Sequence, residues 1–257
     1  MSIKINIVLI GGQSNAVGCT DKYTLDEKYR NGEYDNVYLY QNGNFEPEAM
    51  NRIIHGIRWG MGCKPYEMGI EYGMAAELND SDYPVGFIRF AYGGTDLTHF
   101  WQTKFDEIPK VVHDKGYCYY EFINTVKCGM KAYREAGFDP VIKGMVWMQG
   151  ESDTNKTIVE AEQYEDNLRE LFCCIRKEIE MPSLKIIVGG ISTMPPLAPY
   201  SDVVRSRQEH YCKCDDNALY VDNTDIPIGK DGWHYNGNED LILGKRFGKH
   251  IKEFCFR

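Results

Sequence analysis

Apolar residues along the chain gather into five short runs with strand character. The first of them contains the segment Ile7-Val8-Leu9-Ile10 and stops at two glycines. Runs of this length are typical of strands buried on both faces of a sheet. The five predicted strands cover residues 4–10, 84–91, 143–148, 184–190 and 218–222.

Longer stretches between these strands repeat apolar residues at a spacing near 3.6, which predicts amphipathic helices. The clearest three cover residues 119–136, 159–179 and 239–254. Strands alternating with helices predict βαβ units and a parallel sheet covered on both faces. We therefore expect a single α/β domain over residues 1–257, folded as a three-layer α/β/α sandwich with a five-stranded, mainly parallel sheet.

Residues 20–64 interrupt this alternation and are interpreted as an insertion. Within it, "VYLYQNGNFEPE" predicts a small hairpin, with Asn42-Gly43 as its tight turn. The insertion is rich in tyrosine and also contains His55, Arg58 and Trp59. It is either a wall of the substrate cleft, with aromatic rings stacking on sugars, or a small aromatic core.

Composition excludes two classes of partner. Charged residues make up 26% of the 257 residues, and the formal net charge is −9. Nucleic acids and anionic membranes bind cationic surfaces, so neither is expected as a partner. Because the N-terminal residues resemble no secretory signal and no apolar run is long enough to cross a membrane, we expect a cytoplasmic protein. The oligomeric state stays open.

Nine cysteines are present, and no two of them form a C-x-x-C pair. The closest are Cys173-Cys174 and the pair Cys212 and Cys214, which flanks Lys213. The favoured interpretation is free thiols in a reducing compartment. The alternative is that His210, Cys212 and Cys214 form half of a metal site. The predicted chemistry requires no metal and no organic cofactor.

The segments that follow the predicted strands carry the candidate chemistry. Since ligands bind outside the carboxyl ends of parallel strands, these segments should meet at one edge of the sheet. The first is "GGQSN", which ends in Gln13-Ser14-Asn15; the others are "GGT" with Gly94, "QGESD" with Gln149 and Glu151, and "DGWH" with Asp231 and His234.

Each segment alone has an ordinary explanation as a glycine turn, and "GGQSNAVG" does not match a phosphate-binding P-loop. Together they contain the groups that a serine esterase requires. Ser14 is a nucleophile that needs an adjacent base, and His234 is that base. Asp231, three residues earlier, would hold the imidazole. The oxyanion of the tetrahedral intermediate would be met by the backbone N–H groups of Ser14 and Gly94 and the side-chain amide of Gln149.

These four blocks resemble the SGNH-hydrolase superfamily, and within it carbohydrate esterase family 6 and the sialate O-acetylesterase-like group, which is related to acetylxylan esterases. The resemblance runs from about residue 5 to about residue 249 and implies a flavodoxin-like fold. It implies Ser14 as nucleophile and His234 as general base, with Asp231 as the acid of the triad. Glu151 is the alternative acid, or else orients the histidine or its loop.

The sequence departs from the family pattern at two places. Ala16 stands where methionine is common, and Tyr235-Asn236 follow the histidine where proline is common. Neither change removes a catalytic atom. Candidate substrate-binding residues are Gln13, Asn15, Trp59 and Trp101, although the first two could instead fix the turn around Ser14.

The expected activity is removal of O-acetyl groups from a carbohydrate through an acetyl-serine intermediate. Acetylated xylo-oligosaccharide, sialic acid or a related glycan are the candidate substrates. Two alternatives stay open. One is a lipase-like or thioesterase-like hydrolase of other short acyl esters, and the other is a non-catalytic carbohydrate-binding protein on the same fold.

Overall fold

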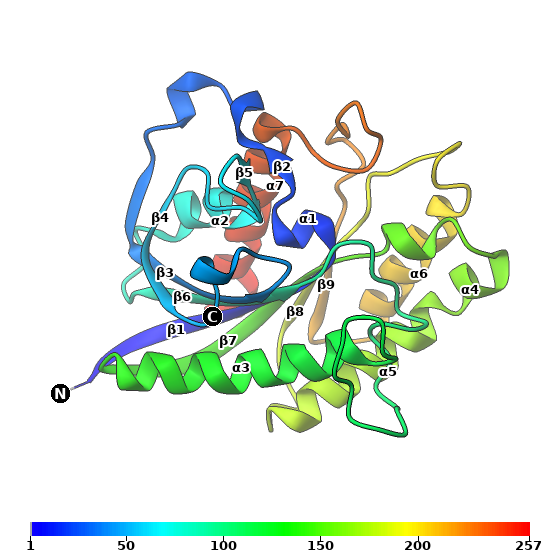
Figure 1. Cartoon of the computed structure of the whole chain (residues 1–257), viewed down its shortest axis with the longest axis horizontal. Helices are drawn as coiled ribbons and strands as arrows, with labels where there is room; N and C mark the ends of the chain where they lie inside the picture. The colour runs from blue at the N-terminus through cyan, green and yellow to red at the C-terminus, as the bar shows by residue number, and fades with distance from the viewer. Residues whose placement is uncertain (1) are drawn as a thin grey trace.

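A computed structural model describes residues 2–257, which form a twisted seven-stranded sheet between two layers of helices (Figure 1). The strand order is β4-β3-β6-β1-β7-β8-β9, and only β4 runs antiparallel to its neighbour. The strands are β1 (Ile3–Gly12), β3 (Glu33–Gly43), β4 (Ile53–Arg58), β6 (Val85–Ala91), β7 (Phe138–Met148), β8 (Ile186–Gly189) and β9 (Ala218–Val221). A separate two-stranded ribbon joins β2 (Thr20–Asp21) to β5 (Glu67–Met68).

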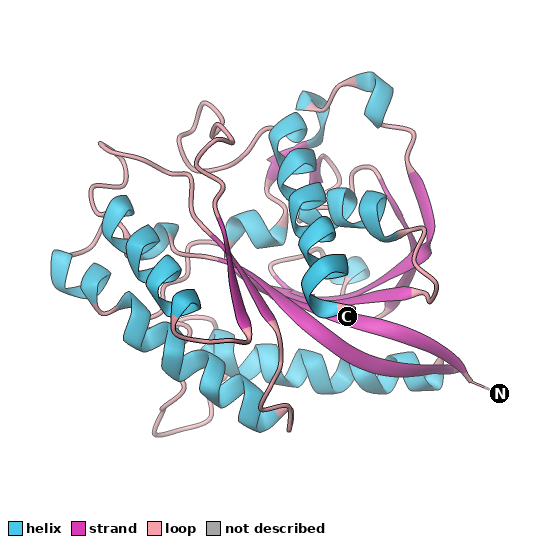
Figure 2. Ribbon diagram, turned by 180° about the vertical axis from the view of Figure 1, so that it is seen from behind, coloured by secondary structure: helices cyan, strands magenta, loops and turns pink. Residues whose placement is uncertain are grey.

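The helices cover both faces of the sheet, and each face has its own hydrophobic core. Helices α2 and α7 pack together on one face, while α3, α5 and α6 cover the other (Figures 1 and 2). The bounds are α1 (Ser14–Val17), α2 (Ile70–Leu78), α3 (Tyr117–Glu135), α4 (Ile158–Glu162), α5 (Tyr164–Glu178), α6 (Ser201–Lys213) and α7 (Gly237–His250). Short 3-10 turns are η1 (Lys22–Thr24), η2 (Glu27–Tyr29), η3 (Pro47–Ala49) and η4 (Glu151–Asp153); a π-helical turn, η5 (Ile251–Cys255), extends α7.

All five predicted strands are present. Numbered along the chain, β6-β1-β7-β8-β9 is 2-1-3-4-5, the order of flavodoxin-like sheets. The predicted number of strands was wrong, because β3 and β4 extend the sheet beyond β6. The supposed insertion over residues 20–64 therefore supplies two strands of the main sheet.

The hairpin predicted around Asn42-Gly43 was also wrong. Both residues remain in β3 and pair in parallel with Phe90 and Ala91 of β6. Gly43 has a φ of +116°, and a Cβ at this position would lie 2.4 Å from the carbonyl oxygen of Ala91. The absence of a side chain at Gly43 therefore allows β3 and β6 to approach each other closely.

The helix predicted over residues 119–136 is α3, whereas the one predicted over 159–179 is broken at Gln163 into α4 and α5. The last predicted helix is α7 with its π-helical turn. Helix α2 was not predicted. Seven of its nine residues are buried, so it has no polar face and no amphipathic pattern in the sequence. Within residues 2–257, no helix is both long and apolar enough to cross a membrane; the cytoplasmic location stays a prediction.

Strand β1 lies between β6 and β7, where the strand order reverses. The carboxyl ends of these three strands therefore meet at the topological switch point, the usual ligand-binding position in an open α/β sheet. Three of the four sequence blocks with candidate chemistry follow these strands.

Candidate active site

The turn that carries Ser14 is fixed by close packing between β1 and β7. Gly12 has a φ of +144°, and a Cβ there would lie 1.9 Å from the carbonyl oxygen of Met148. The backbone N–H of Gln13 donates to that same oxygen at 3.0 Å. Only glycine allows this approach, so the strand can run directly into α1.

Ser14 is the first residue of α1 and lines a pocket of about 430 Å³. At the first position of a helix, the backbone N–H has no acceptor within the helix and can serve a ligand. Gly94 lines the same pocket. It has a φ of +71°, and a Cβ built on it would meet nothing within 4 Å, so its backbone faces open space.

His234 also lines the pocket, and Asp231 holds its ring. The His234 Nδ1–H donates to Asp231 Oδ2 at 2.6 Å, which leaves Nε2 as the basic nitrogen. The other oxygen, Asp231 Oδ1, accepts the backbone N–H groups of Trp233 at 2.8 Å and His234 at 2.9 Å. Ser14 and His234 form no hydrogen bond in this structure, and such contacts commonly tighten only when substrate binds.

These contacts also set the charge of Asp231. Partial burial would raise its pKa, but the N–H groups of His234 and Trp233 and the imidazole outweigh burial and lower it. Asp231 is therefore ionised at neutral pH. An ionised carboxylate on Nδ1 stabilises the imidazolium that forms when His234 accepts a proton.

Glu151 also lines the pocket, but it is only 2% exposed and lies against Asn15 rather than His234. Its Oε1 accepts the side-chain amide of Asn15 at 2.6 Å, while its Oε2 is buried without a hydrogen-bond partner. Burial raises its pKa, opposed by the Asn15 hydrogen bond and the charge of His234. The same amide of Asn15 donates to the carbonyl of Trp233 at 3.0 Å. Asn15 thus joins the Ser14 turn to both the Glu151 loop and the His234 loop.

Gln149 is completely buried behind the pocket, and its amide is fully engaged. Nε2 donates to Asp153 Oδ2 at 2.6 Å, to the Thr95 carbonyl at 2.9 Å and to Gln13 Oε1 at 3.3 Å. Oε1 accepts the hydroxyl of Tyr164 at 3.0 Å. In this geometry no N–H of Gln149 is free for an oxyanion, contrary to the role expected from the sequence.

Two tryptophans expected to bind substrate lie elsewhere. Trp101 is 1% exposed, stacks edge-on against Trp147 in the core and donates its indole N–H to Thr95 Oγ1. That expectation was wrong, since a buried ring cannot contact a sugar. Trp59 is half-buried outside the pocket, with its indole N–H on the carbonyl of Lys22.

Several residues that line the pocket were not singled out from the sequence, and Trp233 and Asn44 are the two that the proposed function uses. Trp233 lines the pocket beside His234, where the "DGWH" block already displayed an aromatic ring. Asn44 lines the opposite side; its backbone N–H donates to the carbonyl of Ala91, and its Oδ1 lies 3.4 Å from where a Gly93 Cβ would be. Asn44 was missed because the hairpin prediction placed it away from the sheet edge.

Two groups among residues 2–257 could hold a metal ion. Cys19, Cys63 and Glu67 form one of them, and Cys19 also lines the Ser14 pocket. Glu165, His210 and Cys214 form the other, on the surface. The second contains two of the three residues suggested by the sequence, but not Cys212. Neither group includes a residue of the Ser14–His234–Asp231 set.

Comparison with known proteins shows the family. Residues 4–253 match the family described as carbohydrate esterase, sialic acid-specific acetylesterase. A protein of Arabidopsis thaliana, named "Probable carbohydrate esterase At4g34215", is 31% identical over 97% of this chain and 91% of its own length. The chain belongs to this family.

Solved structures agree with the fold of this carbohydrate esterase family. The Arabidopsis protein superposes with a TM-score of 0.72 at 21% identity, covering 99% of this chain and 100% of that one. XAC1771, described as a novel carbohydrate acetylesterase from Xanthomonas citri, superposes with a TM-score of 0.67 at 15% identity, over 97% of this chain and 56% of that one. The family is the branch expected from "GQSN" and "QGESD"; the assignment to carbohydrate esterase family 6 stays a prediction.

Proposed function

We propose that this family member is a carbohydrate O-acetylesterase in which Ser14, His234 and Asp231 form the catalytic triad. The observation that carries the proposal is the shared pocket of Ser14 and His234, with Asp231 2.6 Å behind the ring. A nucleophile, a base and a group that orients the base are the three parts required for acyl transfer.

In the proposed reaction, Ser14 Oγ attacks the acetyl carbonyl carbon while His234 Nε2 takes the hydroxyl proton. The tetrahedral intermediate collapses as the bond to the sugar oxygen breaks, and His234 returns the proton to that oxygen. Water, deprotonated by His234, then attacks the carbonyl carbon of acetyl-Ser14. The bond from that carbon to Ser14 Oγ breaks, acetate leaves, and His234 returns the proton to Oγ. Asp231 stays ionised throughout and stabilises the imidazolium.

The oxyanion of the intermediate would be met by the backbone N–H groups of Ser14 and Gly94. We assign the third donor to the side-chain amide of Asn44 in place of Gln149. Asn44 lines the pocket next to the Gly93-Gly94 turn, whereas every amide hydrogen of Gln149 has a protein acceptor. One such donor contributes about 100-fold to 1,000-fold to the rate.

The family supports an acetylated carbohydrate as substrate, such as an O-acetylated sialic acid or xylo-oligosaccharide. The pocket volume of about 430 Å³ lies within the usual range for small-molecule sites. Trp233 offers an aromatic face for a sugar ring, and Asn44 is the contribution of residues 20–64 to the pocket wall. This segment would therefore help to shape the substrate cleft.

The test is acetate release from defined acetylated sugars by the wild-type chain and by Ser14→Ala. We expect release by the wild type and loss of all turnover in the variant, with an unchanged circular dichroism spectrum. Turnover by the variant at the wild-type rate would refute Ser14 as nucleophile.

A panel of esters with increasing acyl length separates the alternatives. A preference for acyl chains of about eight carbons or more would indicate the lipase-like alternative. If the folded wild type neither hydrolyses any ester nor reacts at Ser14 with an organophosphonate, the protein is a non-catalytic binding module.

A further inference from the structure

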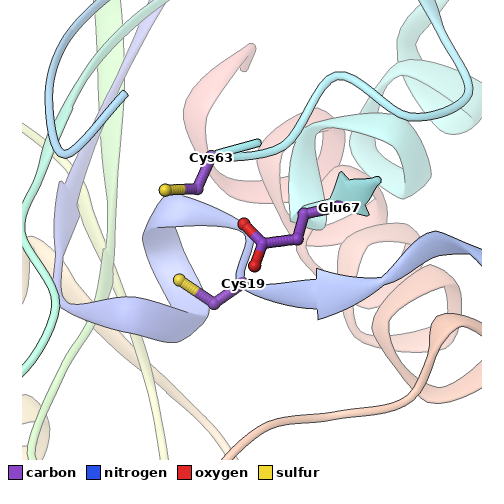
Figure 3. Close-up of side chains that lie close together, drawn as sticks. All are labelled: Cys19, Cys63 and Glu67. Atoms are coloured by element: carbon purple, nitrogen blue, oxygen red, sulfur yellow. The ribbon is translucent and has the colours of Figure 1, made fainter. Parts of the chain in front are cut away.

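Cys19, Cys63 and Glu67 lie close together next to the Ser14 pocket (Figure 3), with Cys19 on one segment and Cys63 and Glu67 on another. The two sulfurs and a carboxylate oxygen all lie within 4.8 Å of one another. Cys19 lies between α1 and β2, Cys63 precedes β5, and Glu67 belongs to β5. None of the three takes part in the proposed ester hydrolysis.

Hydrogen bonds between the two segments hold the backbone around this cluster. The Cys63 N–H donates to the carbonyl of Gly18 at 3.1 Å, and Asp21 pairs with Glu67 across the β2–β5 ribbon. The N–H of Lys64 donates to Glu67 Oε2 at 3.1 Å, which orients the carboxylate. The three side chains are therefore presented by a preorganised frame, and an ion would need to move them little.

We propose that Cys19, Cys63 and Glu67 form a binding site for one thiophilic divalent cation of the Zn²⁺ class. Tetrahedral zinc with bonds of about 2.3 Å to sulfur and about 2.1 Å to oxygen places its ligand atoms roughly 3.5 to 3.8 Å apart. The spacing within 4.8 Å needs only a small contraction to reach this geometry. Binding releases the protons of both thiols, since thiolates are the ligands.

Access and the fourth coordination position follow from the surroundings. Cys63 and Glu67 are 7% and 8% exposed, whereas Cys19 is less buried and opens onto the Ser14 pocket. An ion can enter from that pocket and keep a water or a substrate oxygen as its fourth ligand. Three protein ligands with one open position are typical of zinc sites that keep a water or substrate as a ligand, rather than of closed structural sites.

The cluster also contacts the pocket through Asn44. The thiol of Cys63 donates to the Asn44 carbonyl at 2.7 Å. Coordination removes the proton of that thiol, so the Asn44 carbonyl loses this donor, while the Asn44 N–H keeps its hydrogen bond to the carbonyl of Ala91 at 3.1 Å. The ion site is thus distinct from the catalytic residues yet coupled to the pocket wall. The inference does not rest on the proposed esterase activity.

The surface group of Glu165, His210 and Cys214 provides a matched control. Glu165 already pairs with Arg169 at 2.8 Å, and His210 is 59% exposed, so this group is neither free nor enclosed. It carries one thiol where the proposed site carries two. The two groups therefore differ in the number of thiolate ligands that an ion would acquire.

The test is a titration of the full, reduced chain with Co²⁺ as a spectroscopic probe, which gives a thiolate-to-metal absorption band. We expect one tightly bound ion per chain with the intensity of two thiolates. Cys19→Ser and Cys63→Ser should each halve the band and weaken binding by about 100-fold. Glu67→Gln should keep the band and weaken binding by about ten-fold, and Cys214→Ser should change nothing.

A folded wild-type chain that shows no band, or a band that survives unchanged in both Cys19→Ser and Cys63→Ser, overturns the proposal. So does a band that Cys214→Ser removes. Thermal unfolding with and without Zn²⁺ is the second readout, because an ion that binds only the folded chain raises the unfolding midpoint. That rise should be the same in Cys214→Ser as in the wild type and much smaller in Cys19→Ser at the same Zn²⁺ concentration.

Discussion

Two loops at the carboxyl edge of the sheet carry acidic residues and an amide or a histidine, yet they differ in burial. In the loop before α7, the side chains of Asp231 and His234 are 51% and 30% exposed. In the loop after β7, Gln149, Glu151 and Asp153 are at most 2% exposed. The first loop exposes His234 in the pocket, whereas the second reaches the pocket through Glu151 and Ser152 but is largely buried; we call the second the supporting loop.

A sequence motif at the carboxyl edge of the sheet can therefore either expose its polar groups in the pocket or bury them as a support. Asp231 gives one oxygen to the His234 ring and the other to the backbone of its own loop. Gln149, in contrast, gives its amide to three protein acceptors and is inaccessible. Asn15 connects the two loops, so in the proposed reaction the supporting loop would help to position the loop that carries His234.

The strongest test of the exposed loop is Asp231→Asn. The amide should favour the wrong tautomer of His234 and lose the charge that stabilises the imidazolium, so we expect kcat to fall by about 10⁴-fold. Stability should change little, because the side chain is half exposed. The measurement is acetate release alongside urea unfolding, with the exposed Asp216→Asn as the control. Full activity in Asp231→Asn would move the acid role to Glu151.

Replacing the two amide side chains separately, in Asn44→Ala and Gln149→Ala, tests the difference between an amide that lines the pocket and one that is buried. Asn44→Ala should lower kcat by about 100-fold to 1,000-fold with stability nearly unchanged, because it removes an oxyanion donor. Gln149→Ala removes one buried hydrogen bond from Asp153 and one from Tyr164, which keep the Leu97 N–H and the backbone carbonyl of residue 149, and it leaves a cavity; we expect a cost of about 2–4 kcal/mol in the free energy of unfolding. The measurements are single-turnover kinetics and urea unfolding. The comparison breaks if Asn44→Ala is fully active while Gln149→Ala is inactive and stable.

Much of the fold could be predicted from the apolar pattern, because the runs that became β1, β6, β7 and β8 are buried on both faces and form nearly continuous apolar segments. The fifth run became β9, an edge strand that is only partly buried. Strand β3 was mistaken for a hairpin because Asn42-Gly43 carries a turn signal that here serves close strand packing. Helix α2 has no polar face and so no visible period.

Part of the candidate site could be predicted because its residues lie in recognisable local motifs. Ser14, Gly94 and His234 each sit beside a sequence signal and line one pocket. Burial, however, depends on contacts far apart in the chain. Gln149 is enclosed by Gln13 and Thr95, and Trp101 by Trp147, and no local pattern reveals such neighbours.

The smallest expected effect concerns Asp153 in the supporting loop, whose protonation should make the stability of the protein depend on pH. Burial is the main cause that raises its pKa, to about 7 from an ordinary 3.8, and the charge of Asp96 adds to it. Between about pH 4 and pH 7 the folded chain therefore holds a proton that the unfolded chain has lost, so the free energy of unfolding falls as pH rises.

Asp153→Asn removes this titration while keeping the shape of the side chain. The free energy of unfolding of the wild type, minus that of the variant, should fall by about 2 kcal/mol between pH 5 and pH 7 and level off above. Urea unfolding at a series of pH values measures it. Parallel curves for the two proteins would mean that Asp153 is ionised in the folded chain across this range. The donors Gln149 and Leu97 would then outweigh burial, and the supporting loop would be as charged as the loop that presents His234.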